Sequence, residues 1–70
     1  MSFADEFGWT EVEFGAIRAE VRANIDALFA NGGYPAIDME YHALSAVSES
    51  ELPAEQVYYK RVLANILVMA

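Results

Sequence analysis

The chain has 70 residues, of which eleven are Asp or Glu and four are Lys or Arg, so its formal net charge is −7 with the single His neutral. This length permits one small domain, and the absence of cysteine excludes a disulfide framework and a thiolate metal site. The shortage of Lys and Arg argues against direct binding to nucleic acid or to an anionic membrane. Because a chain this short buries only about 60% of the surface that it exposes when unfolded, we expect self-association or a partner to reinforce it.

The two ends of the chain show no export or membrane-spanning signal. Asp5 and Glu6 lie where a secretory signal needs a basic region followed by an apolar run. The most apolar stretch, residues 62–70, is much shorter than the about 20 residues that span a bilayer. We therefore expect a cytoplasmic protein with no membrane partner.

Two helix starts follow one another near the N-terminus. Ser2 can cap a short turn of helix, and Gly8 can end it. Thr10 and Glu13 then form a T-x-x-E capping box, in which each residue satisfies a backbone N–H of the other. This pattern predicts a new helix that begins directly after Thr10.

The next segment predicts a long helix over about residues 11–31. Trp9 and Phe14 occupy the positions of a hydrophobic staple at its start, and Gly32-Gly33 stops it. One face carries a stripe of apolar residues that we expect to face the core. These residues are Phe14, Ile17, Val21, Ile25, Leu28 and Phe29, of which we place the first five in the core.

A second face of this predicted helix carries small side chains, which we call the Ala seam. It consists of Val12, Ala16, Ala19, Ala23, Ala27 and Ala30. Small residues in register let another helix come close, either within the fold or from a second copy of the chain. Ala is also the best helix former and fills solvent-facing positions, so both interpretations stay open.

Residues 36–47 fit either a strand or a helix. Apolar and polar residues alternate from Ile37 to Ala43, which is the strand period, whereas Ile37, Tyr41 and Leu44 cluster on one helical face. Ala, Met, Glu and Leu favour helix over strand, and Pro35 suits a first helical turn. We expect a helix here.

The last segment predicts a helix over about residues 51–69. Ser50 can cap it, with Pro53 in the first turn. This helix is apolar nearly all round, which is typical of an enclosed helix, so a homodimer is expected. The expected dimer contacts are Ala16, Ala19, Ala23, Tyr58, Val62, Ile66 and Met69.

Together these elements predict an all-α fold, a single acidic domain of three main helices preceded by a short helical turn. The long helix contributes its apolar stripe to the core. We expect the other two helices to face it with Tyr41, Leu44, Val62, Leu63 and Ile66. Phe7 and Trp9 would close one end.

No pattern for catalysis is present. Asp38, Glu40 and His42 would share one face of a strand and could hold a divalent metal there, but on a helix only Asp38 and His42 meet. The serines near His42 lack a nucleophile elbow, and Gly32-Gly33 follows a helix and so opens no phosphate loop. We therefore predict a non-enzyme without metal or cofactor.

Spaced carboxylates among aromatic residues suggest that the chain binds another protein. A rigid surface of this kind can imitate the phosphates of a duplex and occupy a Lys/Arg groove. In charge, without any shared motif, the chain resembles the small acidic phage inhibitors of restriction and CRISPR systems. The expected contacts with a basic nucleic-acid-binding protein are Asp5, Glu6, Phe7, Trp9, Glu11, Glu13, Glu49, Glu51 and Glu55. The alternatives are acidity for solubility only and a homodimeric assembly module that uses the Ala seam and the C-terminal helix.

Overall fold

A computed structural model describes residues 3–69 of the chain and the side chains of residues 5–69. Every regular element in this part is helical: α1 (Phe3–Phe7), α2 (Glu11–Asn31), α3 (Tyr34–Ser45), the 3-10 turn η1 (Glu49–Glu51) and α4 (Ala54–Met69). The predicted all-α class is thus confirmed, and the predicted Ser2 cap lies outside the described residues. None of these helices is long and apolar enough to cross a membrane.

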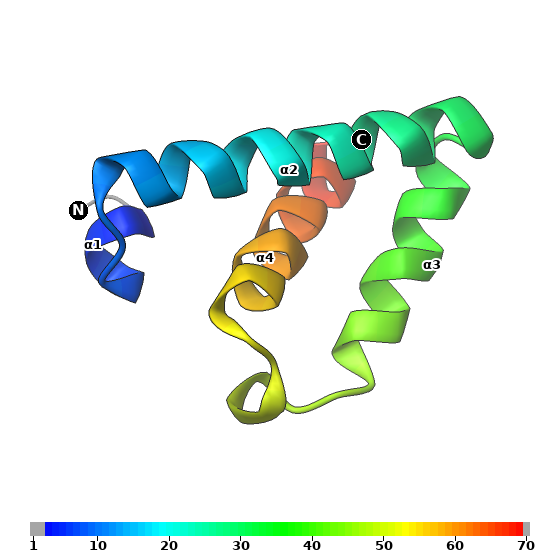
Figure 1. Cartoon of the computed structure of the whole chain (residues 1–70). Coiled ribbons are helices and arrows are strands. Elements are labelled where there is room, and N and C mark those ends of the chain that lie inside the picture. The colour runs from blue at the N-terminus through cyan, green and yellow to red at the C-terminus, as the bar shows by residue number, and fades with distance from the viewer. Residues whose placement is uncertain (1–2, 70) are drawn as a thin grey trace.

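The helices are arranged around α4 (Figure 1). The long helix α2 runs along one edge of the molecule, and α3 turns back from its C-terminal end. After η1 the chain returns through α4, which passes between α1 and α3 and crosses α2. As a result, α4 packs within its own chain on three other helices.

The start of α2 follows the predicted capping box. The Glu13 backbone N–H donates to Thr10 Oγ1 at 3.1 Å, and the Thr10 N–H donates to Glu13 Oε1 at 2.9 Å. The rings of Trp9 and Phe14 stack with centroids 6.0 Å apart, as expected for the staple. Gly8, in the turn before them, has φ +74°, a conformation that favours glycine. The predicted helix 11–31 is confirmed.

The helix α3 begins two residues earlier than predicted, at Tyr34 rather than at residue 36, and ends at Ser45. The reason is Gly33, whose φ of +70° reverses the chain directly after α2. Pro35 then lies in the first turn, where it needs no N–H donor. The choice between strand and helix is settled in favour of the helix.

The helix α4 begins three residues later than predicted, at Ala54. Leu52 precedes a proline and is held in the extended conformation, with ψ 140°. The Pro53 carbonyl, instead of Ser50, opens the helix by accepting the N–H groups of Gln56 and Val57 at 3.0 and 3.1 Å. Ser50 belongs to the preceding turn η1.

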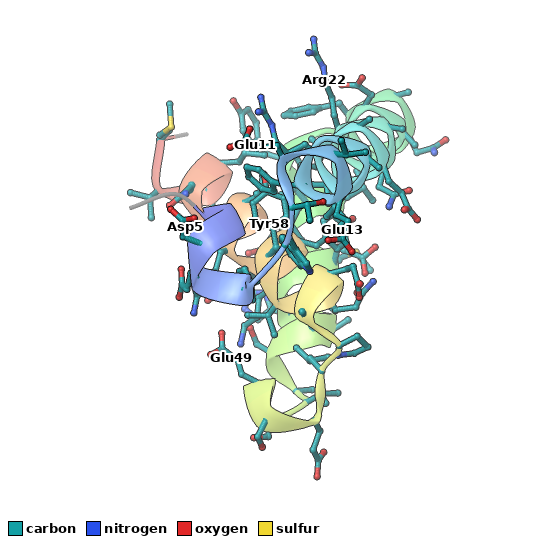
Figure 2. The ribbon with its side chains drawn as sticks, turned by 60° about the vertical axis from the view of Figure 1, so that its left-hand side comes forward. Asp5, Glu11, Glu13, Arg22, Glu49 and Tyr58 are labelled. Carbon is teal, nitrogen blue, oxygen red and sulfur yellow. The ribbon has the colours of Figure 1, made fainter. Side chains whose placement is uncertain are left out.

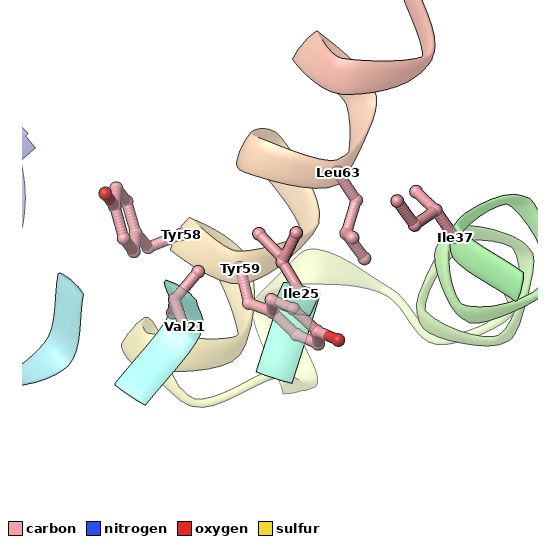
Figure 3. Close-up of a cluster of buried hydrophobic side chains, with 6 residues drawn as sticks. All are labelled: Val21, Ile25, Ile37, Tyr58, Tyr59 and Leu63. Atoms are coloured by element: carbon pink, nitrogen blue, oxygen red, sulfur yellow. The ribbon is translucent and has the colours of Figure 1, made fainter. Parts of the chain in front are cut away.

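The core lies where α2, α3 and α4 meet (Figure 3). Ile37 and Leu63 are fully buried and lie next to each other, and Val21 and Ile25 of α2 lie beside Tyr58 and Tyr59 of α4. All ten predicted core residues lie in this cluster or against it, and so do Phe7 and Trp9. The prediction left out three buried members: Ile37, Tyr58 and Tyr59.

A dimer was expected because α4 is apolar nearly all round and needs enclosure, but α4 is already enclosed within its own chain. Val57, Tyr58, Tyr59 and Leu63 are buried within their own chain, and of the large apolar side chains of the helix only Val68 and Met69, at its end, are exposed. The helix therefore needs no second chain for its enclosure. A homodimer stays a prediction that must rest on another surface.

Candidate functional site

The crossing of α2 over α4 divides the surface above the core into two sides. On one side Glu20 and Asn24 of α2 face Glu55 of α4, with Tyr59 between them. On the other side Arg18 and Arg22 of α2 line an open groove. We call the first the acidic side, with members Glu13, Glu20, Glu40 and Glu55, and the second the arginine groove.

The acidic side draws carboxylates from three helices. Glu13 and Glu20 are two helical turns apart on α2, so they share a face, and Glu55 stands in the first turn of α4. Burial raises the pKa of the Tyr59 phenol above its usual value, and the nearby Glu40 of α3 raises it further. Glu20, Glu40 and Glu55 thus lie around one buried tyrosine, and Glu13 lies two turns from Glu20 along α2.

No cation neutralises these four carboxylates within residues 3–69. The ion pairs in this part of the chain join Arg61 to Glu6 at 2.6 Å, Lys60 to Glu49 at 3.8 Å and His42 to Asp38 at 3.3 Å. All of them lie elsewhere, and Glu13, Glu20 and Glu55 are exposed. The acidic side therefore presents its full negative charge to the solvent.

Glu13 has a second role, because its carboxylate completes the capping box. Hydrogen bonds from the backbone N–H and the side chain of Thr10 hold the pKa of this carboxyl below its usual value. These bonds favour the charged form, so Glu13 stays ionised to lower pH than an isolated glutamate does.

The arginine groove has a volume of about 560 Å³ and an apolar floor. Val21 and Ile25 of α2 and Tyr58 and Val62 of α4 are among the residues that line it. The Arg18 guanidinium lies over the Phe14 ring at 5.5 Å from its centroid. In the part of the chain that the structure describes, neither Arg18 nor Arg22 makes an ion pair.

Near α1, three predicted partner contacts serve the fold itself. Glu6 accepts a hydrogen bond from Arg61 of α4 and raises the pKa of that guanidinium. Arg61 also lies over the Phe7 ring, 5.4 Å from its centroid. Phe7 in turn stacks on Trp9 with centroids 4.7 Å apart, and both rings are half-buried. These contacts hold α1 against α4.

The nine predicted partner contacts are not brought together on one face. Glu11 and Glu13 lie on different sides of α2 (Figure 2), because two residues along a helix differ by about 200°. Of the nine, only Glu13 and Glu55 belong to the acidic side. The others lie on α1 (Asp5, Glu6, Phe7), in the following turn (Trp9), on the groove side of α2 (Glu11) and in η1 (Glu49, Glu51).

The predicted dimer contacts also separate. Ala16, Ala19 and Ala23 are exposed, so no helix of the same chain covers the Ala seam there. Tyr58 is 8% exposed and packs in its own core. The remaining members are half-buried against the core (Val62, Ile66) or exposed at the end of α4 (Met69).

Sequence reasoning missed Glu20 and Glu40 as members of the acidic side. Glu20 could have been found, since it lies seven residues after Glu13 on one helix. Glu40 could not, because its position near Tyr59 depends on how α3 packs on α4. On α3, His42 pairs with Asp38, and residues 3–69 contain no cluster of three potential metal ligands.

No protein-family model, no curated protein and no solved structure matches this chain. The function is therefore inferred from the charge, burial and geometry of the two sides alone.

Proposed function

We propose that the chain is a non-catalytic protein-binding module, whose acidic side occupies a basic nucleic-acid-binding surface of a partner protein. The observation that carries this proposal is the set of uncompensated carboxylates around Tyr59. Glu13, Glu20, Glu40 and Glu55 come from three helices and make no ion pair in the described part of the chain.

The packing of the acidic side supports this role. The helices hold the backbone positions of these carboxylates in place, so binding needs to order only the glutamate side chains and no backbone segment. Tyr59 is buried between α2 and α4 and fixes the distance between their carboxylates. A Lys/Arg groove that normally binds phosphates would find similarly spaced charges here, so the mechanism is electrostatic and steric occlusion.

The test compares two exposed carboxylates of α2 that lie on different faces. Glu20→Lys reverses a charge on the acidic side, whereas Asp26→Lys makes the same change elsewhere on the helix. Each immobilised variant is exposed to a lysate of the source cells, bound proteins are released with rising salt, and a short DNA duplex is added as a competitor.

We expect the wild-type chain and Asp26→Lys to retain the same basic protein, which rising salt or duplex DNA displaces. Glu20→Lys should lose it. Retention of the same proteins by all three chains would contradict the proposal. So would a captured protein that duplex DNA does not displace.

A further inference from the structure

The arginine groove differs in charge from the rest of this acidic chain. It gathers two of the four Lys/Arg side chains, and these are the two without an ion pair within residues 3–69. Its volume of about 560 Å³ lies in the range of natural binding sites. An occupant must supply apolar surface for the floor and negative charge for Arg18 and Arg22.

The same helix carries a matching charge at its N-terminal end. Glu11 lies seven residues before Arg18 and eleven before Arg22, which is two and three helical turns, so all three share one face of α2. Figure 2 shows Glu11 and Arg22 on this side of the helix, with Glu13 on the other. From Glu11 to Arg22 the charge order along this face is negative, positive, positive, and Asp26 follows one turn after Arg22.

We propose that the arginine groove is the docking site for a second copy of this chain, with the two α2 helices antiparallel about a two-fold axis that passes midway between Gly15 and Arg18. A two-fold axis makes each contact occur twice. Reversal of the charge order then sets Glu11 against Arg22 of the partner subunit and Arg22 against Glu11 of the partner subunit. The face is thus complementary to itself at Glu11 and Arg22, whereas Arg18 lies over the Phe14 ring of its own chain.

The surface near this axis admits a close approach. A Cβ atom built on Gly15 would meet no other atom within 4 Å, so the helix is open there. Only seven side chains of the described part are buried although 56% of the chain is apolar, which leaves apolar surface for a second copy to cover.

Docking at the groove leaves the acidic side free, because Glu20 stands opposite Glu11 around α2. A dimer of this kind would display two acidic sides. The inference does not depend on the function proposed above, since its test measures self-association only.

The test is a charge exchange followed by sedimentation velocity over a range of protein concentrations. Glu11→Lys and Arg22→Glu each replace two attractive pairs by two repulsive ones, so each should raise the dimer dissociation constant about tenfold or more, which corresponds to about 1.4 kcal/mol. An equimolar mixture of the two variants restores both attractive pairs, and it should associate like the wild-type chain.

Glu20→Lys is the matched control, because it changes the charge of α2 equally on the opposite face, and it should leave the dimer unchanged. The melting temperature of each variant shows that it is folded. As a measurement without substitutions, the amide NMR signal of Gly15 in the wild-type chain should shift with protein concentration.

Three results would overturn the proposal: a wild-type chain that stays monomeric, single variants that associate as the wild type does, or a mixture that does not recover. In the first case, a titration with decanoate would show whether the groove takes a small apolar carboxylate in place of a second copy.

Discussion

The acidic side and the arginine groove are built by the same two helices, yet they carry opposite charge. On one side of the crossing Glu20 faces Glu55, and on the other Arg18 and Arg22 line an apolar groove. The net charge of −7 is therefore distributed unevenly. A single crossing of two helices thus presents carboxylates on one side and arginines above an apolar floor on the other.

Truncation of a buried side chain where α2 crosses α4 should disturb both the acidic side and the arginine groove. Leu63 is fully buried between α2 and α3, so Leu63→Ala should lower the free energy of unfolding by about 2–5 kcal/mol. Chemical denaturation followed by circular dichroism measures this loss. Val68→Ala is the control, since Val68 is 84% exposed, and its effect should stay within about 0.5 kcal/mol. Equal unfolding midpoints for the two variants would contradict the described core.

A change in the turn between α2 and α3 should affect the acidic side more than the groove. Gly33 has φ +70° and ψ −145°, a conformation that is nearly restricted to glycine, so Gly33→Ala should cost about 1–3 kcal/mol and weaken the placement of Glu40. Gly15→Ala, in the open part of α2, should instead stabilise the monomer by about 0.5–1 kcal/mol. Thermal melting measures both. If the two variants changed the melting temperature in the same direction, the φ angle of Gly33 or the open space at Gly15 would be wrong.

Loss of the α2 cap should destabilise the first turn of α2, which carries Glu11 and Glu13. Thr10→Ala removes the side-chain acceptor of the Glu13 N–H and should cost about 1 kcal/mol, which lowers the melting temperature by about 4–8 °C in a domain of this size. Ser45→Ala, at the exposed end of α3, should have a smaller effect. Equal effects would argue against the capping box.

The same cap makes stability depend on pH through Glu13. The folded-state pKa of this carboxyl lies below the usual 4.5, so its contribution is fully present above about pH 4.5 and is lost as the pH falls through the folded-state pKa. Glu13→Gln should therefore melt below the wild-type chain at pH 7, and the difference should close in acid. A difference that is the same at both pH values would contradict this role.

The smallest expected effects are changes in melting temperature, which should have opposite signs for substitutions on the two sides. At low salt Glu20→Gln relieves repulsion on the acidic side and should raise the melting temperature, whereas Arg22→Gln removes a cation from an acidic chain and should lower it. Each change should stay within about 0.5 kcal/mol and shrink as salt is added. Shifts of the same sign would contradict the difference in charge between the two sides.

Local signals in the sequence predicted the parts of the fold that depend on neighbouring residues. The capping box of Thr10 and Glu13 and the apolar stripe of α2 are of this kind, because each rests on contacts within a few helical turns. The start of α4 was predicted too early, since the constraint that Pro53 places on Leu52 was not weighed.

The acidic side could be predicted only in part. Glu20 and Glu55 are 35 positions apart in the sequence and meet because α2 crosses α4, which no local pattern shows. The separation of Glu11 from Glu13, in contrast, follows from helical periodicity and was available in the sequence. The same holds for the shared face of Glu11, Arg18 and Arg22.

We propose that a basic partner binds the acidic side, and an NMR titration locates such binding residue by residue. An oligo-arginine peptide is titrated into the isotope-labelled chain at low salt, and the shifted amide signals are mapped. We expect saturable shifts of the amide signals of Glu20, Asn24 and Glu55. These shifts should disappear as salt rises, and the amide signals of Arg18 and Arg22 should not shift in the same way. Shifts spread evenly over the exposed carboxylates, or concentrated at the arginine groove, would contradict this proposal.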